Sequence, residues 1–373
     1  MNTKLLNPVK LLNPGPVSLT ARVRNVLASE DVCHREPEFK ALVGLVRERI
    51  AGVYEETNAS GYVPVLLGGS GTCAVEAMLS LVAKDETTLV VANGVYGERI
   101  AAMLKAQGKR YEAITSPWTS GIDLDAAEEA LKRGPLASAP GQERFGHVLG
   151  VHHETTTGRL NDLAGLGKLA VRYAVPMLVD AVSSFAGEEL RLARWNIEAL
   201  AATANKCVHG APGVSFVLAK GEALKRPSGA TSVYLDLARH AAEQAKGSTP
   251  FTLPTHVTRA LDEALAELED EGGWRTRRDI YRARSSRVRG VCREASAPLL
   301  LERDDAYGAT LTSFRLPAGH TYERLHAELK RDGFVIYAGQ GKFDGAIFRI
   351  AVMGDLSTAD VDRLATSLRG ALA

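Results

Sequence analysis

The sequence of 373 residues is poor in cysteine and in aromatic residues. Its four cysteines, at positions 33, 73, 207 and 292, show no CxxC spacing, so we expect neither a disulfide framework nor a metal site. The first residues do not have the pattern of a signal peptide. Together these absences predict a protein of the reducing cytoplasm.

An excess of one charge and long apolar runs are also missing. Lysine and arginine number 45 against 44 aspartate and glutamate, and no block of like charge occurs. This balance argues against nucleic acid or a membrane surface as partner and favours small-molecule substrates. No apolar run reaches the roughly 18 residues of a membrane span. The length exceeds that of a usual single core, so we expect two lobes.

One lysine stands where packing gives no reason for a lysine. Lys206 lies in the small-residue stretch ATANKCVHGAPG, ahead of VSFVL, which has the pattern of a short buried strand. Partial desolvation would lower the pKa of its ammonium and favour the neutral amine that Schiff-base chemistry with a carbonyl cofactor requires. For this stretch alone, a solvated loop lysine is the competing interpretation.

A glycine-rich turn lies upstream, between a predicted strand at 63–67 and a helix. In the turn GGSGT, the glycines let the backbone approach a ligand, and the helix N–H groups with the hydroxyls of Ser70 and Thr72 can bind phosphate. The turn lacks the spacing of dinucleotide and P-loop motifs. It therefore predicts a phosphate cradle, with a purely structural turn as the alternative.

From residue 87 onward, predicted strands and helices alternate. The strands are almost continuously apolar, which is typical of a parallel sheet covered by helices on both faces. In such sheets the ligand binds beyond the carboxyl ends of the strands. The residues that follow predicted strand ends, and that we expect at one rim, are Ser70, Tyr96, Thr155, Asp180 and Lys206.

Asp180 closes the apolar run VPMLVD, where a carboxylate needs a cation or a hydrogen-bond donor; capping of a loop is the alternative role. A phosphate cradle, a turn aromatic, a strand-end aspartate and a turn lysine are the parts that a pyridoxal 5′-phosphate enzyme needs. The aromatic would stack on the cofactor ring, Asp180 would keep the pyridine nitrogen protonated, and Lys206 would hold the aldehyde.

Eight segments resemble the class V aminotransferases of fold type I, and the resemblance covers nearly the whole chain, from about residue 10 to residue 370. The segments are LLNPGPV, VLLGGSGTCAVEA, VANGVYGERI, HHETTTGRLN, LVDAVSSFAG, ANKCVHGAPGVSFV, FTLPTHV and FVIYAGQGKFDGAIFRIAVMG. The resemblance implies an α/β enzyme with a large domain, whose mainly parallel sheet lies between helices, and a smaller α+β C-terminal domain. Within the class, the chain is most similar to the 2-aminoethylphosphonate–pyruvate transaminases, with the alanine–glyoxylate and serine–pyruvate transaminases as more distant relatives.

The resemblance also implies a role for individual residues. Lys206 matches the lysine that holds the cofactor and Asp180 the partner of its pyridine nitrogen. The other residues implied in cofactor binding are Ser70, Gly71, Thr72, Tyr96, Thr155, Val182, Asn205 and Thr252. Thr252 matches a threonine that reaches the cofactor phosphate of the neighbouring subunit, which implies a homodimer with shared active sites.

Arg349 matches the arginine that binds the substrate carboxylate. Its bidentate fork suits the carboxylate of pyruvate and, in the other half-reaction, a phosphonate. His34 and Arg35 are expected at the substrate end of the site, with helix capping as the alternative role.

The expected organisation is an N-terminal strap at residues 1–17, a large cofactor-binding domain at 18–255 and a small domain at 256–373. Ser18 is the predicted N-cap of the first helix. In the small domain we expect a helix to about residue 266, a charged stretch to 289 and then a strand at 311–316. Beyond it the pattern predicts a helix at 322–331, the strands FVIYA and AIFRIAV, and a last helix at 358–372.

Departures from the family pattern fall near the substrate end. Cys-His-Arg-Glu at 33–36 replaces a Cys-Ser-Arg-Asp-like stretch, residues 338–341 replace a Pro-Gly-Lys run, and IAVMG replaces IGNIG. The expected reaction moves the amino group of 2-aminoethylphosphonate to pyruvate and gives phosphonoacetaldehyde and alanine. The alternatives are a related transaminase that uses serine, alanine or a hydroxylated aminophosphonate with glyoxylate or pyruvate, a cysteine desulfurase-like lyase, and a binding protein without catalysis.

Overall fold

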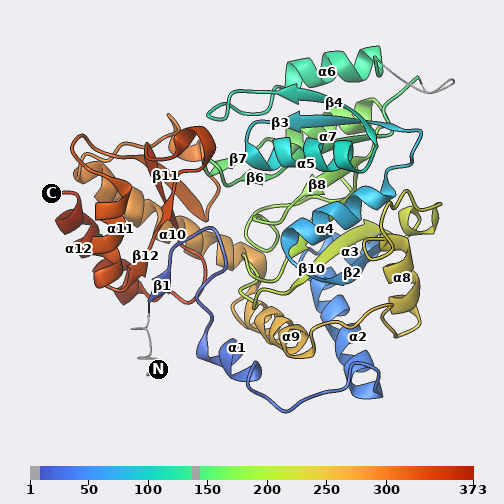
Figure 1. Cartoon of the computed structure of the whole chain (residues 1–373), viewed down its shortest axis with the longest axis horizontal. Helices are drawn as coiled ribbons and strands as arrows, with labels where there is room; N and C mark the ends of the chain where they lie inside the picture. The colour runs from blue at the N-terminus through green and yellow to red at the C-terminus, as the bar shows by residue number, and fades with distance from the viewer. Residues whose placement is uncertain (1–8, 137–142) are drawn as a thin grey trace.

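The computed structural model describes residues 9–136 and 143–373, arranged around a central sheet of seven strands (Figure 1). The strand order is β2-β10-β9-β8-β5-β3-β4. In that order, the strands span Tyr62–Gly68, Val214–Lys220, Ile197–Thr203, Met177–Asp180, His147–Val151, Thr87–Ala92 and Arg110–Thr115. Strand β10 runs antiparallel to both of its neighbours, whereas β9, β8, β5, β3 and β4 are parallel to one another. The predicted mainly parallel sheet is thus confirmed.

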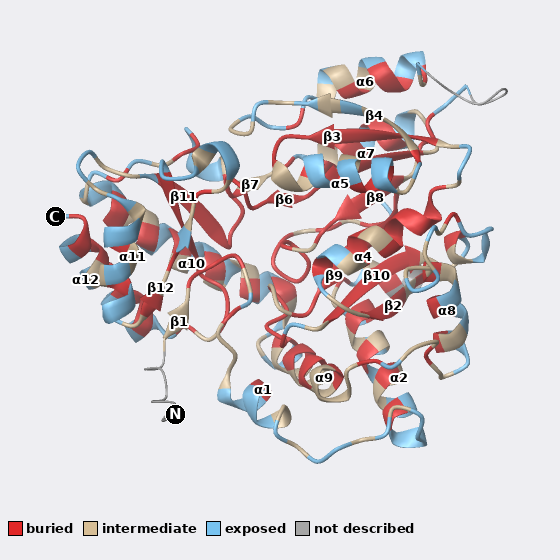
Figure 2. Ribbon diagram, viewed as in Figure 1, coloured by how far each residue is buried: buried red, intermediate tan, exposed pale blue. Residues whose placement is uncertain are grey.

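Helices cover both faces of this sheet, and its strands are buried throughout most of their length (Figure 2). Successive side chains of a strand point to opposite faces. Accordingly, Val65 and Leu67 belong to one apolar core and Leu66 to the other. The first core includes α4 (Gly71–Met78), α5 (Val95–Ala106) and α8 (Leu237–Ala245). The second includes α2 (Pro37–Gly52), α6 (Leu124–Arg133), α7 (Leu163–Arg172) and α9 (Thr255–Asp270).

The edge strand β2 is closed by a side chain of α8. Gln244 accepts a hydrogen bond of 2.9 Å from the N–H of Leu66 and donates one of 2.7 Å to its carbonyl. An amide side chain pairs in this way with backbone groups that an edge strand would otherwise leave open. The glycine turn that follows β2 therefore starts from a fixed strand.

A second, smaller sheet with the order β11-β14-β13 forms the core of the C-terminal region. Its antiparallel strands span Leu311–Arg315, Ile347–Ala351 and Tyr337–Ala338. Helices α10 (Gly273–Glu294), α11 (Tyr322–Arg331) and α12 (Thr358–Ala371) accompany these strands. The small α+β domain expected from the sequence is present.

One stretch of this region for which no element was predicted is helical, and one expectation was wrong. The charged stretch before residue 289 forms helix α10, because Trp274, Tyr281, Val288 and Val291 recur on one buried face between the arginines. The expected strand FVIYA is divided between two sheets: β12 (Phe334–Val335) pairs with the N-terminal segment, and β13 pairs with β14.

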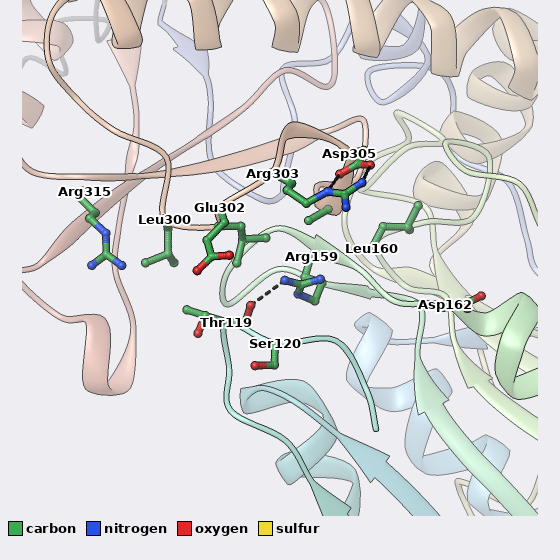
Figure 3. A pocket seen from close by; sticks show the side chains of 12 residues that line it. Thr119, Ser120, Arg159, Leu160, Asp162, Leu300, Glu302, Arg303, Asp305 and Arg315 are labelled. Atoms are coloured by element: carbon green, nitrogen blue, oxygen red, sulfur yellow. Dashed lines mark hydrogen bonds and ion pairs between the residues drawn. The ribbon is translucent and has the colours of Figure 1, made fainter. Parts of the chain in front are cut away.

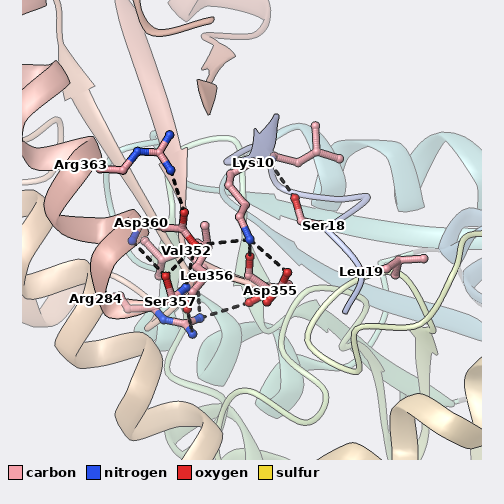
Figure 4. Close-up of polar contacts among 12 residues, drawn as sticks. Lys10, Ser18, Leu19, Arg284, Val352, Asp355, Leu356, Ser357, Asp360 and Arg363 are labelled. Atoms are coloured by element: carbon pink, nitrogen blue, oxygen red, sulfur yellow. Dashed lines mark hydrogen bonds and ion pairs between the residues drawn. The ribbon is translucent and has the colours of Figure 1, made fainter. Parts of the chain in front are cut away.

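The N-terminal strap docks onto the small domain. Strand β1 (Lys10–Leu11) runs parallel to β12, and Lys10 Nζ lies 2.6 Å from the carbonyl oxygen of Asp355 and 3.3 Å from the carboxylate of Asp360 (Figure 4). Residues 1–8 of the predicted strap lie outside the described residues. Ser18 does not cap a helix: its hydroxyl accepts from the N–H of Leu11 at 2.9 Å.

Thr20 caps the first helix, α1 (Ala21–Val26), with its hydroxyl oxygen accepting from the N–H of Val23. Helix α9 packs against α1 and α2, which are elements of the large domain. We therefore propose a domain division between α9 and α10, near Gly272, in place of residue 256.

The remaining elements are short. They are the helix α3 (Glu56–Ala59), the hairpin strands β6 (His153–Glu154) and β7 (Arg159–Leu160), and 3-10 turns at Leu79–Leu81, Ala223–Lys225, Asp304–Ala306 and Gly341–Phe343. Within the described ranges, no helix combines the length and the apolar character that crossing a bilayer requires.

Candidate functional site

Five of the predicted site residues line one small pocket at the carboxyl rim of the sheet. They are Gly71, Thr72, Tyr96, Asp180 and Val182. Gly71 and Thr72 begin helix α4, Tyr96 belongs to α5, and Asp180 ends β8. The parallel topology thus gathers residues that are far apart in the sequence, which is what the strand-end pattern predicted.

Lys206 lies in the turn between β9 and β10, partly buried beneath the strap. Its Nζ donates a hydrogen bond to the carbonyl of Pro14. The strap packs closely on the lysine stem, because a Cβ on Gly15 would lie 2.6 Å from Lys206 Cδ. Burial lowers the pKa of Lys206 to about 8, although the negative charge of Asp180 opposes this shift. A neutral amine is therefore accessible near neutral pH.

Asp180 is buried, and its Oδ1 accepts a hydrogen bond of 2.9 Å from the N–H of Val182. Burial raises its pKa to about 6, and the buried Glu154 adds to this effect, whereas Lys206 and Arg99 favour the charged form. The carboxylate is ionised above that pH. The ionised carboxylate can then hold a cation at the strand end, a role that goes beyond capping of the loop.

The start of helix α4 carries no side-chain cap from Ser70, so the N–H groups of its first turn remain open for an anion. Gly71 is packed against Val182, since a Cβ there would lie 2.7 Å from Val182 Cγ1. Ser70 and Thr72 are exposed beside it. The turn therefore has the geometry of a phosphate cradle.

Tyr96 is the second residue of α5 and not part of the preceding turn, contrary to expectation. The helix begins earlier because the buried carboxylate of Glu154 accepts hydrogen bonds from the N–H groups of Tyr96 at 3.2 Å and Gly97 at 3.4 Å. The Arg99 guanidinium lies 4.8 Å from the centre of the Tyr96 ring. One face of this ring is thus covered by a cation.

Glu154 was not predicted as a site residue. Its carboxylate also accepts a hydrogen bond of 2.6 Å from the hydroxyl of Thr156, and a Cβ on Gly94 would lie only 2.3 Å from it. Burial raises the pKa of Glu154, while the hydrogen bonds that it accepts lower it. Glu154 ties the β6–β7 hairpin to α5 and thereby fixes Thr155 relative to Tyr96. Its one sequence signal is an acidic residue at the end of an apolar strand.

Arg349 and Thr155 meet between the two domains. Arg349, on the central strand β14, is almost fully buried; its Nη1 donates to the carbonyl of Thr155 at 2.7 Å and its Nε to that of Ala338 at 2.8 Å. Among the described residues, Arg349 Nη2 and the Thr155 hydroxyl have no hydrogen-bond partner although both are buried. Burial lowers the pKa of Arg349. Two unpaired polar atoms in one buried region are what a site for a polar ligand leaves in its absence.

Three predicted residues form a separate group. The Thr252 hydroxyl lies 3.3 Å from His34 Nε2, and Arg35 Nη1 donates to the carbonyl of Thr249 at 2.7 Å. Within the described part of the chain, no hydrogen bond joins this group to Lys206 or Arg349. Asn205, next to Lys206, accepts a hydrogen bond of 2.9 Å from the Thr203 hydroxyl and supports the lysine turn.

A larger pocket, of about 850 Å³, lies between the domains but contains none of the predicted site residues (Figure 3). Arg159 crosses it and donates a hydrogen bond of 2.6 Å to the carbonyl of Thr119. No group of three or more His, Cys, Asp or Glu suited to a metal occurs in residues 9–136 and 143–373. Lys206 and Asp180 lie apart from this pocket, at the carboxyl rim of the sheet.

Comparison with known proteins gives a family match over most of the chain. The family model described as Aminotransferase class-V matches residues 25–340. The 2-aminoethylphosphonate–pyruvate transaminase of Vibrio vulnificus strain YJ016 is 36% identical over 374 residues, which cover 98% of each chain. The protein of the same name from Bacillus cereus strain AH187 is 37% identical over 372 residues and 97% of each chain.

A further relative is the bifunctional phosphonoacetaldehyde hydrolase/aminoethylphosphonate transaminase of Clostridioides difficile strain 630, which is 36% identical; the chain spans 56% of its length. Among solved structures, an aspartate aminotransferase from Thermus thermophilus has a TM-score of 0.86 at 26% identity, covering 97% of this chain and 99% of that one. An alanine–glyoxylate aminotransferase from Nostoc sp. has a TM-score of 0.89 at 23% identity, covering 100% and 97%. These likenesses confirm the predicted fold class.

Proposed function

Because the chain belongs to the class-V aminotransferases, we propose that it uses pyridoxal 5′-phosphate to transfer the amino group of 2-aminoethylphosphonate to pyruvate, giving phosphonoacetaldehyde and alanine. The observation that carries this proposal is the arrangement of Lys206, Asp180 and the start of α4 at one rim of the sheet, with the unpaired Nη2 of Arg349 in the same interdomain region. Relatives that share the chain's full length support the choice of donor and acceptor.

The residues present fit this cofactor. The open N–H groups at the start of α4 suit its phosphate, the unpaired Thr155 hydroxyl suits its ring oxygen, and the anionic Asp180 suits a protonated ring nitrogen. Tyr96 and Val182 both line the pocket, and the cofactor ring would be held between them. When bound, pyridoxal 5′-phosphate supplies the aldehyde that receives the amino group and a ring that withdraws electrons.

Lys206 is proposed as the residue that first holds the cofactor and then moves the proton. Its lowered pKa, about 8, makes the unprotonated amine available as nucleophile and as base. The Pro14 carbonyl, which accepts its hydrogen bond, restricts the positions of Nζ. With the cofactor bound, the freed Lys206 Nζ would accept the proton from the carbon that carries the donor's amino group and would release that proton again as the amino group is transferred.

Arg349 is proposed to orient the substrate anion. Two of its nitrogens are fixed by carbonyl groups of Ala338 and Thr155, so the unused Nη2 is held in a defined direction. A charge-assisted hydrogen bond to the pyruvate carboxylate, or to the phosphonate of the donor, would compensate for the burial of this cation. Water exclusion follows from the buried position of Arg349 between the domains.

A homodimer with shared sites is part of the proposal. Thr252 is exposed and contacts His34 in a group separate from Lys206, which suits residues that serve the site of a second copy. We propose that His34 and Arg35 act there at the substrate end. The four cysteines are unpaired, which supports a reducing compartment such as the cytoplasm.

A panel of amino donors and oxo-acid acceptors tests the proposal. Purified enzyme loaded with the cofactor is incubated with 2-aminoethylphosphonate, alanine, serine or 2-amino-1-hydroxyethylphosphonate, each with pyruvate or glyoxylate, and products are identified by phosphorus and proton NMR. The proposal predicts that phosphonoacetaldehyde and alanine form fastest. Faster turnover of serine or alanine with glyoxylate would move the enzyme to the glyoxylate-dependent branch, and release of ammonia or sulfide would indicate a lyase.

A further inference from the structure

A loop of the small domain, residues 339–345, joins Arg349 to an indole ring of the large domain. Within this loop, Gln340 Oε1 accepts a hydrogen bond of 3.3 Å from Arg349 Nη1. Ala338, the residue before the loop, accepts from Arg349 Nε. The loop and its entry strand therefore hold two guanidinium nitrogens and leave Nη2 for a ligand. This inference rests on the proposed function and concerns the same site.

The loop is tightly closed, so Gln340 moves together with the residues that follow it. A Cβ on Gly339 would lie 1.9 Å from the carbonyl oxygen of Phe343, which shows how closely the two ends approach. Gly341 has φ +57° and passes directly over Trp118, where a Cβ would lie 2.9 Å from Cη2 of the indole. A side chain at Gly341 would push the loop away from the ring, and one at Gly339 would force the two ends of the loop apart.

Two further loop residues pack on Trp118. The ammonium of Lys342 lies 4.2 Å from the centre of the indole, and the Phe343 ring lies 5.8 Å from it at an interplanar angle of 58°. Trp118 Nε1 donates a hydrogen bond of 2.6 Å to Glu98 Oε1 on α5. The indole therefore binds a cation on its face and an anion at its edge, an arrangement in which each contact strengthens the other.

The segment that carries Trp118 is itself fixed to the large domain. The carbonyl of Thr119 accepts from Arg159 Nη2, as Figure 3 shows, and the carbonyl of Ser120 accepts a hydrogen bond of 2.8 Å from Asn93 Nδ2. Both partners lie at the rim of the central sheet or in the β6–β7 hairpin. Trp118 is thus held to the large domain, whereas the loop 339–345 belongs to the small domain and would move with it.

We propose that Gln340 is a positioning residue for Arg349 and that Trp118, through Lys342 and Phe343, holds Gln340 in place from the opposite domain. This latch sets how firmly the enzyme binds the carboxylate of its 2-oxo acid, and its four residues, Trp118, Gln340, Lys342 and Phe343, act through Arg349 and not by touching the substrate. Closing the latch brings the domains together around the ligand, and opening it lets Arg349 turn away from the site.

Steady-state kinetics of variants provide the first test. Gln340→Ala should raise the KM for pyruvate about three- to tenfold, the effect of one hydrogen bond to a charged group. Lys342→Met, which keeps the length of the side chain, should raise it about two- to fivefold through loss of the cation–π contact. In both variants kcat should change by less than about twofold, because the reacting groups are untouched. Lys330→Met, an exposed lysine of α11, is the matched control and should leave both constants unchanged.

The double variant Trp118→Ala/Gln340→Ala tests whether the two residues act through each other. If Trp118 works by holding Gln340, the double variant should have the same KM as Gln340→Ala alone, and the two single effects will not multiply. Multiplying effects, or an unchanged KM in both Trp118→Ala and Lys342→Met, would overturn the proposal. Trp118→Phe, which retains a ring but lacks the hydrogen bond to Glu98, should lie between wild type and Trp118→Ala.

A binding measurement separates this inference from the choice of amino donor. Pyruvate is titrated into the pyridoxal-loaded enzyme without any amine, so that no transamination occurs, while tryptophan emission is recorded. The wild-type emission should change on binding, the change should be absent in Trp118→Phe, and Gln340→Ala should shift the midpoint to higher pyruvate. If 2-aminoethylphosphonate is not the donor, turnover with it fails while this titration is unaffected. An emission change identical in wild type and Trp118→Phe would contradict the latch.

Discussion

Arg349 of the small domain donates a hydrogen bond of 2.7 Å to the carbonyl of Thr155 in the large domain. This contact places a buried guanidinium beside an unpaired hydroxyl at the junction of the two domains. The junction therefore contains both the group that would orient a substrate anion and a group that would meet the cofactor. Changes at Arg349 are expected to affect substrate binding and the domain contact together.

Replacement of Arg349 by lysine retains the positive charge but removes the planar guanidinium, whose separate nitrogens reach Ala338, Thr155 and a ligand in different directions. We expect kcat/KM for pyruvate to fall about 100-fold, which corresponds to ~3 kcal/mol for a buried charged contact. The binding of pyridoxal 5′-phosphate itself, followed by absorbance, should change little. A lysine variant with wild-type kcat/KM would show that the carboxylate is bound elsewhere.

The pKa of Lys206, lowered by burial to about 8, predicts how fast the cofactor attaches. Only the neutral amine attacks the aldehyde, so the rate of attachment to cofactor-free protein should rise about tenfold per pH unit below pH 8 and level off above it. Stopped-flow absorbance between pH 6 and 10 measures this rate. A midpoint near the ordinary lysine value would contradict the burial of this amine in solution, and Lys206→Ala should show no attachment.

Burial raises the pKa of Asp180 to about 6, so ionisation of this carboxyl destabilises the folded state of the cofactor-free protein. Between about pH 4 and 6 the folded chain binds a proton at Asp180 more tightly than the unfolded chain does. The free energy of unfolding therefore falls as the pH rises through that window. Asp180→Asn should therefore raise the free energy of unfolding at pH 8 by roughly 1–3 kcal/mol. Urea titrations at pH 5 and 8 measure this, with Asp125→Asn on the exposed face of α6 as control. Equal free energies of unfolding for Asp180→Asn and wild type at pH 8 would show that burial of the ionised Asp180 carboxylate does not destabilise the fold.

His147 forms a buried charge cluster at the opposite rim of the sheet. Its ring nitrogens lie 3.3 Å from Glu198 and 3.6 Å from Glu86, and Arg226 also contacts Glu198. Burial alone would lower the pKa of His147, but Glu198 and Glu86 raise it by more than burial lowers it. The pKa of His147 is therefore above the ordinary histidine value. The stability that it contributes is present below the ordinary histidine pKa and is lost as the pH rises through the higher folded value.

We therefore expect the wild-type free energy of unfolding to fall as the pH rises above the ordinary histidine pKa of about 6.5, and His147→Gln to remove part of that slope without changing kcat. Chemical denaturation across this range measures the slope, and His320→Gln serves as a surface control. An identical slope in His147→Gln would show that the imidazole stays neutral.

The sequence predicted the positions of those candidate site residues that follow an apolar strand or open a helix. Asp180, Lys206 and the Ser70 turn each have such a local signal, and the alternating pattern was enough to place them on one rim. Tyr96 was assigned to a turn because the helix start depends on Glu154, which is distant in the sequence. The charged sequence of α10 concealed its apolar face, because long arginine side chains separate the buried positions.

Contacts between distant segments had no such signal. Nothing near Pro14 in the sequence indicates that its carbonyl accepts from Lys206, and nothing near Trp118 indicates that it packs on Lys342 and Phe343. These contacts depend on how the strap and the small domain rest on the large domain, which the local pattern of hydrophobic residues does not encode.

A single-turnover experiment shows whether 2-aminoethylphosphonate is the amino donor of this enzyme. Enzyme loaded with pyridoxal 5′-phosphate is mixed with 2-aminoethylphosphonate in the absence of any oxo acid, and its absorbance is followed until the cofactor has accepted the amino group. We expect complete conversion to the pyridoxamine form with one equivalent of phosphonoacetaldehyde, and return of the original spectrum on addition of pyruvate. An unchanged spectrum with 2-aminoethylphosphonate, in enzyme that converts readily with alanine or serine, would contradict it.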